Sequence, residues 1–163
     1  ADYWASVVHI NEWQTNRFFQ NILHELFNTL AGKTITMLGF AFKQDTGDTR
    51  DSPAIHLCER LVGENAKVRI HDPKALENAR IELKNLKGDL SFVEDVYDAA
   101  DGAHALALVT QWDEYLDLDY KKIHQAMAEP AFIFDGRNHL DHDKLYKIGF
   151  NVFPLGKSPL KHI

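Results

Sequence analysis

Four basic side chains lie in loops directly after predicted strands, and these loops are where the chemistry of this chain is expected. They are Lys43, Arg50, Lys74 and Arg137. In an open α/β sheet, ligands bind beyond the carboxyl ends of the strands, so these cations are predicted to converge at one edge. Arginine offers a planar fork for bidentate phosphate contacts, and lysine offers a mobile point charge. The placement therefore predicts contacts with a phosphate or a sugar hydroxyl.

The loop at 40–52 is the most informative of these segments. A dinucleotide fingerprint reads G-x-G-x-x-G, whereas this chain keeps only its first glycine, Gly39. We therefore expect side chains, and not backbone N–H groups, to hold an anion here, with Gly47 giving the loop freedom to bend. A second interpretation stays open, in which the loop is solvated and pairs its own charges. Those charges belong to Asp45, Asp48, Arg50 and Asp51.

Two aspartates also end predicted strands. Asp135 precedes Gly136, which allows a turn or a close approach, and Arg137, which is expected to project over the sheet edge. The alternative is an Asp–Arg pair that only holds the turn. Asp72 stands where a Rossmann acid binds ribose, but Pro73 follows it, so a structural turn cap is an equal possibility.

Other reactive residue types are interpreted as structural. Cys58 lies at helical spacing from its apolar neighbours, which favours core packing over a nucleophile. His139 and His142 could face one another, but the sequence shows no further ligand that completes a tetrahedral set, so no metal site is predicted. No Ser-His-Asp order or nucleophile elbow is visible either.

Short strands alternate with helices from residue 33 onward. Strands are predicted at 34–40, 67–72, 90–93, 103–110, 131–135 and 150–156. Helices are predicted between them at 52–64, 75–86, 94–102, 120–127 and 142–149. Ser52 and Pro53 suit the N-cap and first position of their helix. Regular alternation predicts an α/β fold, a Rossmann-like, doubly wound, mainly parallel six-stranded sheet, with a loose tail after Gly156.

A long helix is predicted before the sheet. Residues 3–30 repeat apolar positions at helical spacing, and Gly32 is the expected stop. Such a helix would be about 40 Å long, which exceeds what is needed to cover one sheet. We therefore expect it to have been cut from a longer helix, or its first half to pack on something outside this domain.

Composition excludes several classes of function. The chain has 163 residues, 45% hydrophobic and 26% charged, with a net charge of −6, which disfavours nucleic acid or anionic membrane as a partner. It contains one cysteine, and no apolar run approaches the ~20 residues of a membrane span. The start resembles no signal peptide, so a cytoplasmic location is expected.

Four segments carry a family resemblance. GFAFKQDTGDTRDSPA (39–54), IHDPK (70–74), DGAHALALVTQWDEY (101–115) and FIFDGRN (132–138) together resemble the UDP-glucose 6-dehydrogenase family. That family belongs to the wider UDP-glucose/GDP-mannose dehydrogenases. The segment VVHINEWQTNRF looks like the end of the central helix that joins the two halves of such enzymes. The resemblance divides the chain into a dimerisation helix, 1–31, and a UDP-sugar-binding Rossmann-like domain, 32–163.

The resemblance implies a two-step, NAD-dependent oxidation of UDP-glucose to UDP-glucuronate. By matching motifs, Phe42, Lys43 and Arg137 would contact the UDP-sugar, and Arg50 would reach the NAD. The chain has neither an NAD fingerprint nor the family's glycine-flanked catalytic cysteine, so we expect it to be inactive alone. Its expected partners are the N-terminal NAD-binding domain and a second copy, through the opening helix. Alternatives are a related nucleotide-sugar dehydrogenase, acting on UDP-acetamido-sugars or GDP-mannose, a stand-alone nucleotide-binding module, or a dimerisation fragment.

Overall fold

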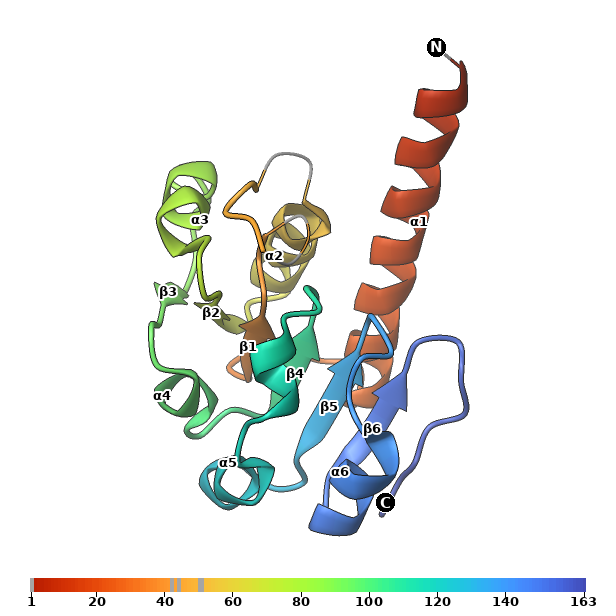
Figure 1. Cartoon of the computed structure of the whole chain (residues 1–163), viewed down its shortest axis with the longest axis vertical. Helices are drawn as coiled ribbons and strands as arrows, with labels where there is room; N and C mark the ends of the chain where they lie inside the picture. The colour runs from red at the N-terminus through yellow and green to blue at the C-terminus, as the bar shows by residue number, and fades with distance from the viewer. Residues whose placement is uncertain (1, 42, 44, 50–51) are drawn as a thin grey trace.

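Six strands form one sheet in the computed structural model, which describes residues 2–41, 43, 45–49 and 52–163, with side chains from residue 14 onward. They are β1 (Thr34–Leu38), β2 (Lys67–His71), β3 (Leu90–Phe92), β4 (Ala105–Leu108), β5 (Phe132–Asp135) and β6 (Asn151–Pro154). All neighbouring strands run parallel, in the order β3-β2-β1-β4-β5-β6 (Figure 1). The predicted fold class is confirmed. The order reverses between β1 and β4, which is the switch point where such sheets bind ligands.

Helices cover both faces of this sheet. They are α1 (Asp2–Glu25), α2 (Pro53–Gly63), α3 (Leu76–Glu82), α4 (Val96–Ala100), α5 (Tyr120–Ala126) and α6 (His142–Ile148). Apolar residues of α1, α2 and α3 pack into one core cluster, and those of α4, α5 and α6 into a second. A short 3₁₀ helix, η1 (Asp113–Leu116), lies where the sequence predicted only a loop.

The start of α2 confirms the predicted cap. Ser52 Oγ accepts a hydrogen bond from the Ala54 N–H at 3.2 Å, and Pro53 occupies the first helical position, where its missing N–H costs nothing. The same hydroxyl donates to the carbonyl of Phe40 at 2.7 Å. One side chain therefore caps the helix and ties it to the residue that follows the first glycine of the β1 loop.

Helix α1 ends earlier than the predicted stop at Gly32. Its last residue is Glu25, and Phe27 and Asn28 follow with φ of 69° and 61°. The N–H of Asn28 donates to the carbonyl of Leu23 at 2.9 Å, which closes the helix end. A residue in the left-handed backbone conformation ends an α-helix, and asparagine adopts this conformation at lower energetic cost than most residues. Gly32 instead serves the turn into β1.

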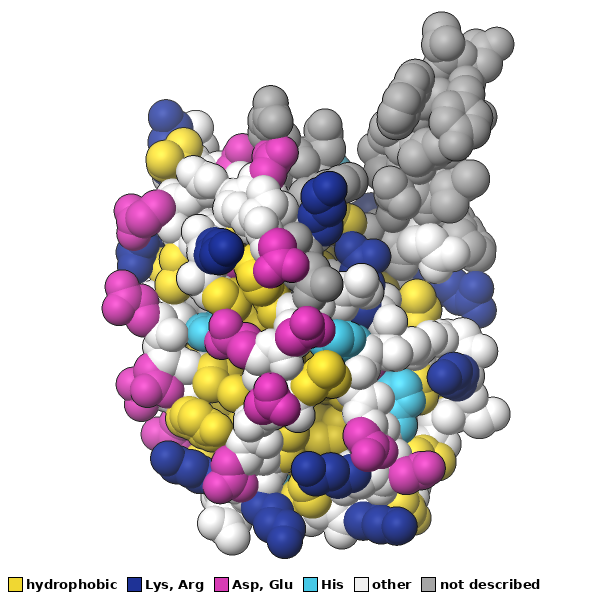
Figure 2. Space-filling view, viewed as in Figure 1, with side chains coloured by type: hydrophobic (Ala, Val, Ile, Leu, Met, Phe, Trp, Pro, Cys, Tyr) yellow, Lys and Arg dark blue, Asp and Glu magenta, His cyan; other side chains and the backbone are white. Residues whose placement is uncertain are grey.

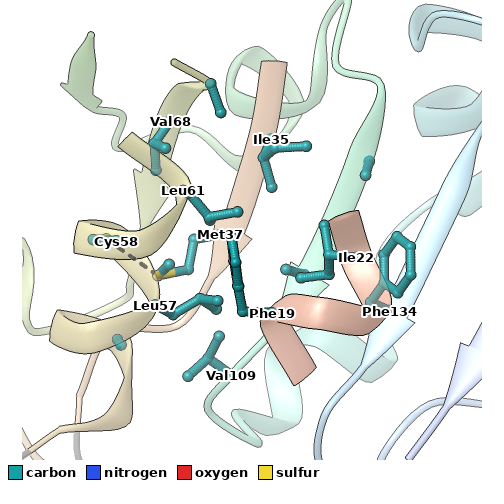
Figure 3. Close-up of a cluster of buried hydrophobic side chains, with 14 of the residues drawn as sticks. Phe19, Ile22, Ile35, Met37, Leu57, Cys58, Leu61, Val68, Val109 and Phe134 are labelled. Atoms are coloured by element: carbon teal, nitrogen blue, oxygen red, sulfur yellow. Dashed lines mark hydrogen bonds between the residues drawn. The ribbon is translucent and has the colours of Figure 1, made fainter. Parts of the chain in front are cut away.

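The second half of α1 belongs to the core of the sheet. Phe19 and Ile22 are buried in the core cluster that also contains Met37, Val109 and Phe134 (Figure 3). The first half of the helix projects past the end of the sheet (Figure 1). A helix this long thus has one end held by the domain and one end that extends beyond it, as its length predicted.

Cys58 is a core residue, as its spacing predicted. Its side chain is fully buried, and its Sγ lies 3.7 Å from the Sδ of Met37 between α2 and β1 (Figure 3). Burial, with a smaller contribution from Glu59, raises the pKa of the Cys58 thiol far above its ordinary value. The neutral thiol is inert at this position, because nucleophilic attack requires the thiolate.

The segment after Gly156 is ordered against the sheet, so the prediction of a loose tail was wrong. Leu160 and Val152 exchange backbone hydrogen bonds of 2.8 and 2.9 Å, and the N–H of His162 donates to Asn151 Oδ1 at 2.7 Å. Strand β6 is an edge strand, whose free N–H and C=O groups accept a further segment. The tail supplies that segment.

Charges of both signs are interspersed on the face shown in Figure 2. Among the described helices, none combines the length and apolarity that crossing a membrane requires.

Candidate functional site

A cleft of about 380 Å³ opens at the carboxyl ends of β1, β4 and β5, where they meet α1 and α2. Two of the predicted cations, Lys43 and Arg137, line it from different loops. The rest of its lining comes from α1, α2 and the strand ends: Gln14, Thr15, Phe18, Pro53, Leu57, Leu108, Val109, Gly136 and Leu155. Two cations on a largely apolar wall suit a ligand with an anionic group attached to a flat or hydrophobic body.

Arg137 is anchored on the near side of this cleft. Its N–H donates to Asp135 Oδ1 at 3.0 Å, and its side-chain Nε donates to the carbonyl of Val109 at 2.9 Å. Arginine has five N–H donors in a fixed fork, so this contact holds the group while the two terminal nitrogens stay in reach of the cleft. The arrangement is suited to a bidentate contact with phosphate.

Gly136 provides the close approach that its position predicted. A Cβ there would lie 2.9 Å from the carbonyl oxygen of Leu108 and 3.3 Å from the ring of Phe18. Its N–H donates to the same carbonyl at 3.1 Å. The backbone before Arg137 is therefore pressed between β4 and α1, and only glycine fits without a shift of its neighbours.

Asp135 holds the turn after β5, but not by pairing with the side chain of Arg137. Its fully buried carboxylate accepts the backbone N–H groups of Arg137, His139 and Leu140 at 2.9–3.0 Å. The guanidinium turns instead to the carbonyl of Val109. Both expected roles are thus partly met: the aspartate is structural, and the arginine faces the cleft.

Asp72 is a structural turn cap, which resolves the open choice. Its carboxylate is 3% exposed and accepts five hydrogen bonds of 2.7–3.1 Å. The donors are the N–H groups of Phe40, Ala41, Lys74 and Ala75 and the indole Nε1 of Trp112. A carboxylate with this many donors has little capacity left for a ribose hydroxyl.

The same hydrogen bonds bear on whether the backbone of the β1 loop can bind a pyrophosphate. In a dinucleotide fingerprint, the N–H groups after β1 face the pyrophosphate. Here those of Phe40 and Ala41 donate to Asp72, and Gly39 is packed so that a Cβ would lie 2.5 Å from Thr110. The residues present therefore do not fit the pyrophosphate of NAD at this strand end, as the missing glycines predicted.

Not every predicted cation reaches the cleft. Lys74 is exposed, with its Nζ 5.9 Å from the ring centroid of Trp112, and it is not among the described residues that line the cleft. The middle of the 40–52 loop instead leans on α3, where Asn78 Nδ2 donates to the carbonyl of Gly47 at 2.5 Å and Thr49 Oγ1 to Glu82 Oε1 at 3.4 Å. Phe42 and Arg50, predicted to contact UDP-sugar and NAD, lie outside the described residues.

Comparison with known proteins agrees with this geometry. Residues 36–142 match the UDP-binding domain of the UDP-glucose/GDP-mannose dehydrogenase family. The chain belongs to this family. It is 45% identical to UDP-glucose 6-dehydrogenase 2 of Oryza sativa subsp. japonica, over 99% of this chain and 37% of that protein. It is also 45% identical to UDP-glucose 6-dehydrogenase of Caenorhabditis elegans, over 98% of this chain and 34% of that protein.

A solved structure supports the same assignment. The UDP-glucose dehydrogenase of the archaeon Pyrobaculum islandicum is 28% identical and superposes with a TM-score of 0.69, covering 90% of this chain and 32% of that one. The chain thus spans about a third of the length of the relatives it matches. It corresponds to the UDP-binding domain of the family, and in this domain the structure places Lys43 and Arg137 in the lining of one cleft.

Sequence reasoning missed the wall that α1 gives to the cleft of this UDP-binding domain. Gln14, Thr15 and Phe18 line it, as does Leu155 after β6. Phe18 repeats at the same helical spacing as the core residues of α1, so its pattern alone marks it as core. Gln14, one turn before it and polar on that face, was the only signal in the sequence, and the pattern could not show what it faces.

Two buried aromatic groups of the UDP-binding domain titrate away from their usual range. Burial lowers the pKa of His71, although nearby Asp72 opposes this, and burial raises the pKa of Tyr115 well above its ordinary value. The His71 Nδ1 and the Tyr115 hydroxyl lie 2.9 Å apart. Both are held neutral beneath the sheet edge, where they fix the β4 loop against β2. In the described part of the chain, no three His, Cys, Asp or Glu side chains gather as a metal ion would need.

Proposed function

We propose that this chain is the UDP-sugar-binding part of an NAD-dependent UDP-glucose 6-dehydrogenase. The enzyme would oxidise UDP-glucose to UDP-glucuronate in two successive hydride transfers. The observation that carries the proposal is the meeting of Lys43 and Arg137 in one cleft at the switch point of the sheet. Relatives named UDP-glucose 6-dehydrogenase at 45% identity support the choice of sugar.

In this proposal the two cations bind the diphosphate. Lys43 supplies a mobile charge from the β1 loop, and Arg137 supplies a fork that the Val109 carbonyl already orients. The apolar wall of Phe18, Pro53 and Leu57 receives the uncharged parts of the ligand. Phe42 would contact the same UDP-sugar, and Arg50 would reach across to NAD, as their motif matches imply.

NAD and the catalytic thiolate would come from an N-terminal domain outside this chain. NAD, when bound there, would accept the hydride, and the UDP-binding domain would bind the substrate. Two observations support the division: the N–H groups after β1 are committed to Asp72, and the thiol of Cys58 is buried and inert. Residues 1–31 would be the end of the central dimerisation helix, and 32–163 the UDP-sugar-binding domain. A cytoplasmic location is part of the proposal, supported by the one reduced cysteine of the sequence.

Calorimetric titration of the 163-residue chain with UDP, UDP-glucose, GDP-mannose and NAD tests the proposal. We expect weak binding of UDP and UDP-glucose, because only one side of the site is present, and weaker binding of the other two. Lys43→Ala and Arg137→Ala should each weaken UDP binding by about tenfold or more, the effect of losing one charge-assisted hydrogen bond. Lys147→Ala, an exposed cation on α6 outside the cleft, is the matched control and should bind UDP as the unmodified chain does. A preference for NAD, or unchanged UDP binding in both cleft variants, would overturn the assignment.

A further inference from the structure

His142 and Asp135 form a pair beside the cleft that ligand contact does not explain. The Nε2 of His142 lies 2.8 Å from Asp135 Oδ2, with the two side chains 14% and 0% exposed. Because a carboxylate can only accept, the imidazole donates this hydrogen bond. His142 is the first residue of α6, so the pair joins that helix to the last residue of β5.

The other bonds of Asp135 lead directly to the cleft. Its Oδ1 accepts the Arg137 N–H at 3.0 Å, while Oδ2 accepts those of His139 and Leu140 at 2.9 Å each, in addition to His142. The turn at 136–140 is thus wrapped around one carboxylate. The orientation of that carboxylate therefore helps to set where the backbone of Arg137 lies, and among the described residues His142 is the one side chain that donates a hydrogen bond to it.

We propose that His142 is a positioning residue for Arg137, acting through Asp135 and never touching the ligand. The ligand in question, a UDP-sugar, rests on the proposed function; the positioning itself does not. Without the imidazole, Oδ2 keeps the backbone donors of His139 and Leu140 and loses the donor that lies outside the turn. A buried carboxylate short of a donor favours a rotated or hydrated arrangement, and the turn must follow it.

The position of Arg137 is tightly constrained, so it cannot accommodate a shift of the turn. Its Nε reaches the Val109 carbonyl at 2.9 Å, and the preceding Gly136 is pressed against Leu108, where a Cβ would lie 2.9 Å from the carbonyl oxygen. A small rotation of the turn therefore breaks the contact with Val109 before it produces any larger rearrangement. The guanidinium then loses its fixed direction into the cleft, and part of the affinity for phosphate with it.

Two variants of His142 and one control test this on the 163-residue chain. His142→Ala should weaken UDP binding by roughly 3- to 10-fold, because part of the free energy of one charge-assisted hydrogen bond is coupled through Asp135 to Arg137. His142→Gln should restore most of the affinity, because its amide N–H can reach Oδ2. Ile148→Ala removes packing from the same helix without touching Asp135, so it should destabilise the chain and leave UDP binding unchanged. The N-cap of α6, Asp141, is intact in all three.

Amide hydrogen exchange at Arg137, His139 and Leu140 gives a second readout that needs no ligand. We expect faster exchange at these amides in His142→Ala and not in Ile148→Ala. UDP binding by His142→Ala that equals the unmodified chain, or an equal loss in Ile148→Ala, would refute the positioning role. If the unmodified chain fails to bind UDP, the proposed function fails, and exchange alone decides: unchanged exchange in His142→Ala then overturns the inference, and faster exchange supports it.

Discussion

Asp72→Ala is expected to be among the most damaging single substitutions in this chain. The carboxylate accepts four backbone N–H groups and the Trp112 indole while 3% exposed, so its removal leaves five donors without their partner. Each buried donor left unpaired costs about 1–3 kcal/mol. Water entering the space recovers part of this, so we expect a loss of about 4 kcal/mol in the free energy of unfolding, at the upper end for single substitutions.

Equilibrium unfolding in urea measures this loss, with Asp119→Ala as the matched control. Asp119 caps α5 by accepting the Lys122 N–H at 3.1 Å, one bond at an exposed site, and its removal should cost about 1 kcal/mol. Asp72→Asn should fall between the two, because one amide oxygen still accepts while the NH₂ group faces donors. If Asp72→Ala lowers the free energy of unfolding no more than Asp119→Ala does, the carboxylate does not hold the loops after β1, β2 and β4 together, and the interpretation of Asp72 as a structural cap is wrong.

Three further predictions concern pH, activity and assembly. Burial lowers the pKa of His71 below its ordinary 6.5, so the unfolded state binds more protons than the folded state as the pH falls below 6.5. The contribution of the neutral imidazole to the free energy of unfolding should be fully present above about pH 6.5 and be lost as the pH falls through the pKa of the folded state. The urea midpoints at about pH 7.5 and 5.5 should therefore differ less in His71→Phe than in the unmodified chain. An equal pH dependence in that variant would contradict this. The chain alone should not reduce NAD with UDP-glucose, measured by absorbance of NADH; turnover that vanishes in Cys58→Ser would show that the buried thiol is a nucleophile after all. The sequence carries Trp4, Val7, Val8 and Trp13 at helical spacing, and the first half of α1 extends past the sheet (Figure 1). Covering apolar surface stabilises by about 25 cal/mol per Å², so self-association through a two-fold contact is expected. Sedimentation of the full chain should then show a dimer and that of a chain starting at Thr15 a monomer; monomers in both would rule the interface out.

Local signals in the sequence determined the elements of this fold. Apolar runs such as 103–110 and 131–135 predicted buried parallel strands, which the structure has at Ala105–Leu108 and Phe132–Asp135. Ser52 and Pro53 predicted a helix start, because a cap depends on a few neighbouring residues only. The strand ends were therefore known from the sequence, and with them the loops that carry Lys43 and Arg137.

Apart from what the family resemblance implied for Lys43 and Arg137, only the tertiary structure decided which of those loops meet. The reversal of strand order between β1 and β4 puts the β1 and β5 loops on either side of one cleft and leaves Lys74, after β2, outside its lining. Strand order depends on packing between segments far apart in the chain, and no local pattern encodes it. For the same reason Asp72 could be a ribose ligand or a cap from its position alone; its donors come from the β1 loop, from its own turn and from Trp112 after β4. Phe18 likewise has the spacing of a core residue, and it lines the cleft because the turn after β5 brings Gly136 against its ring.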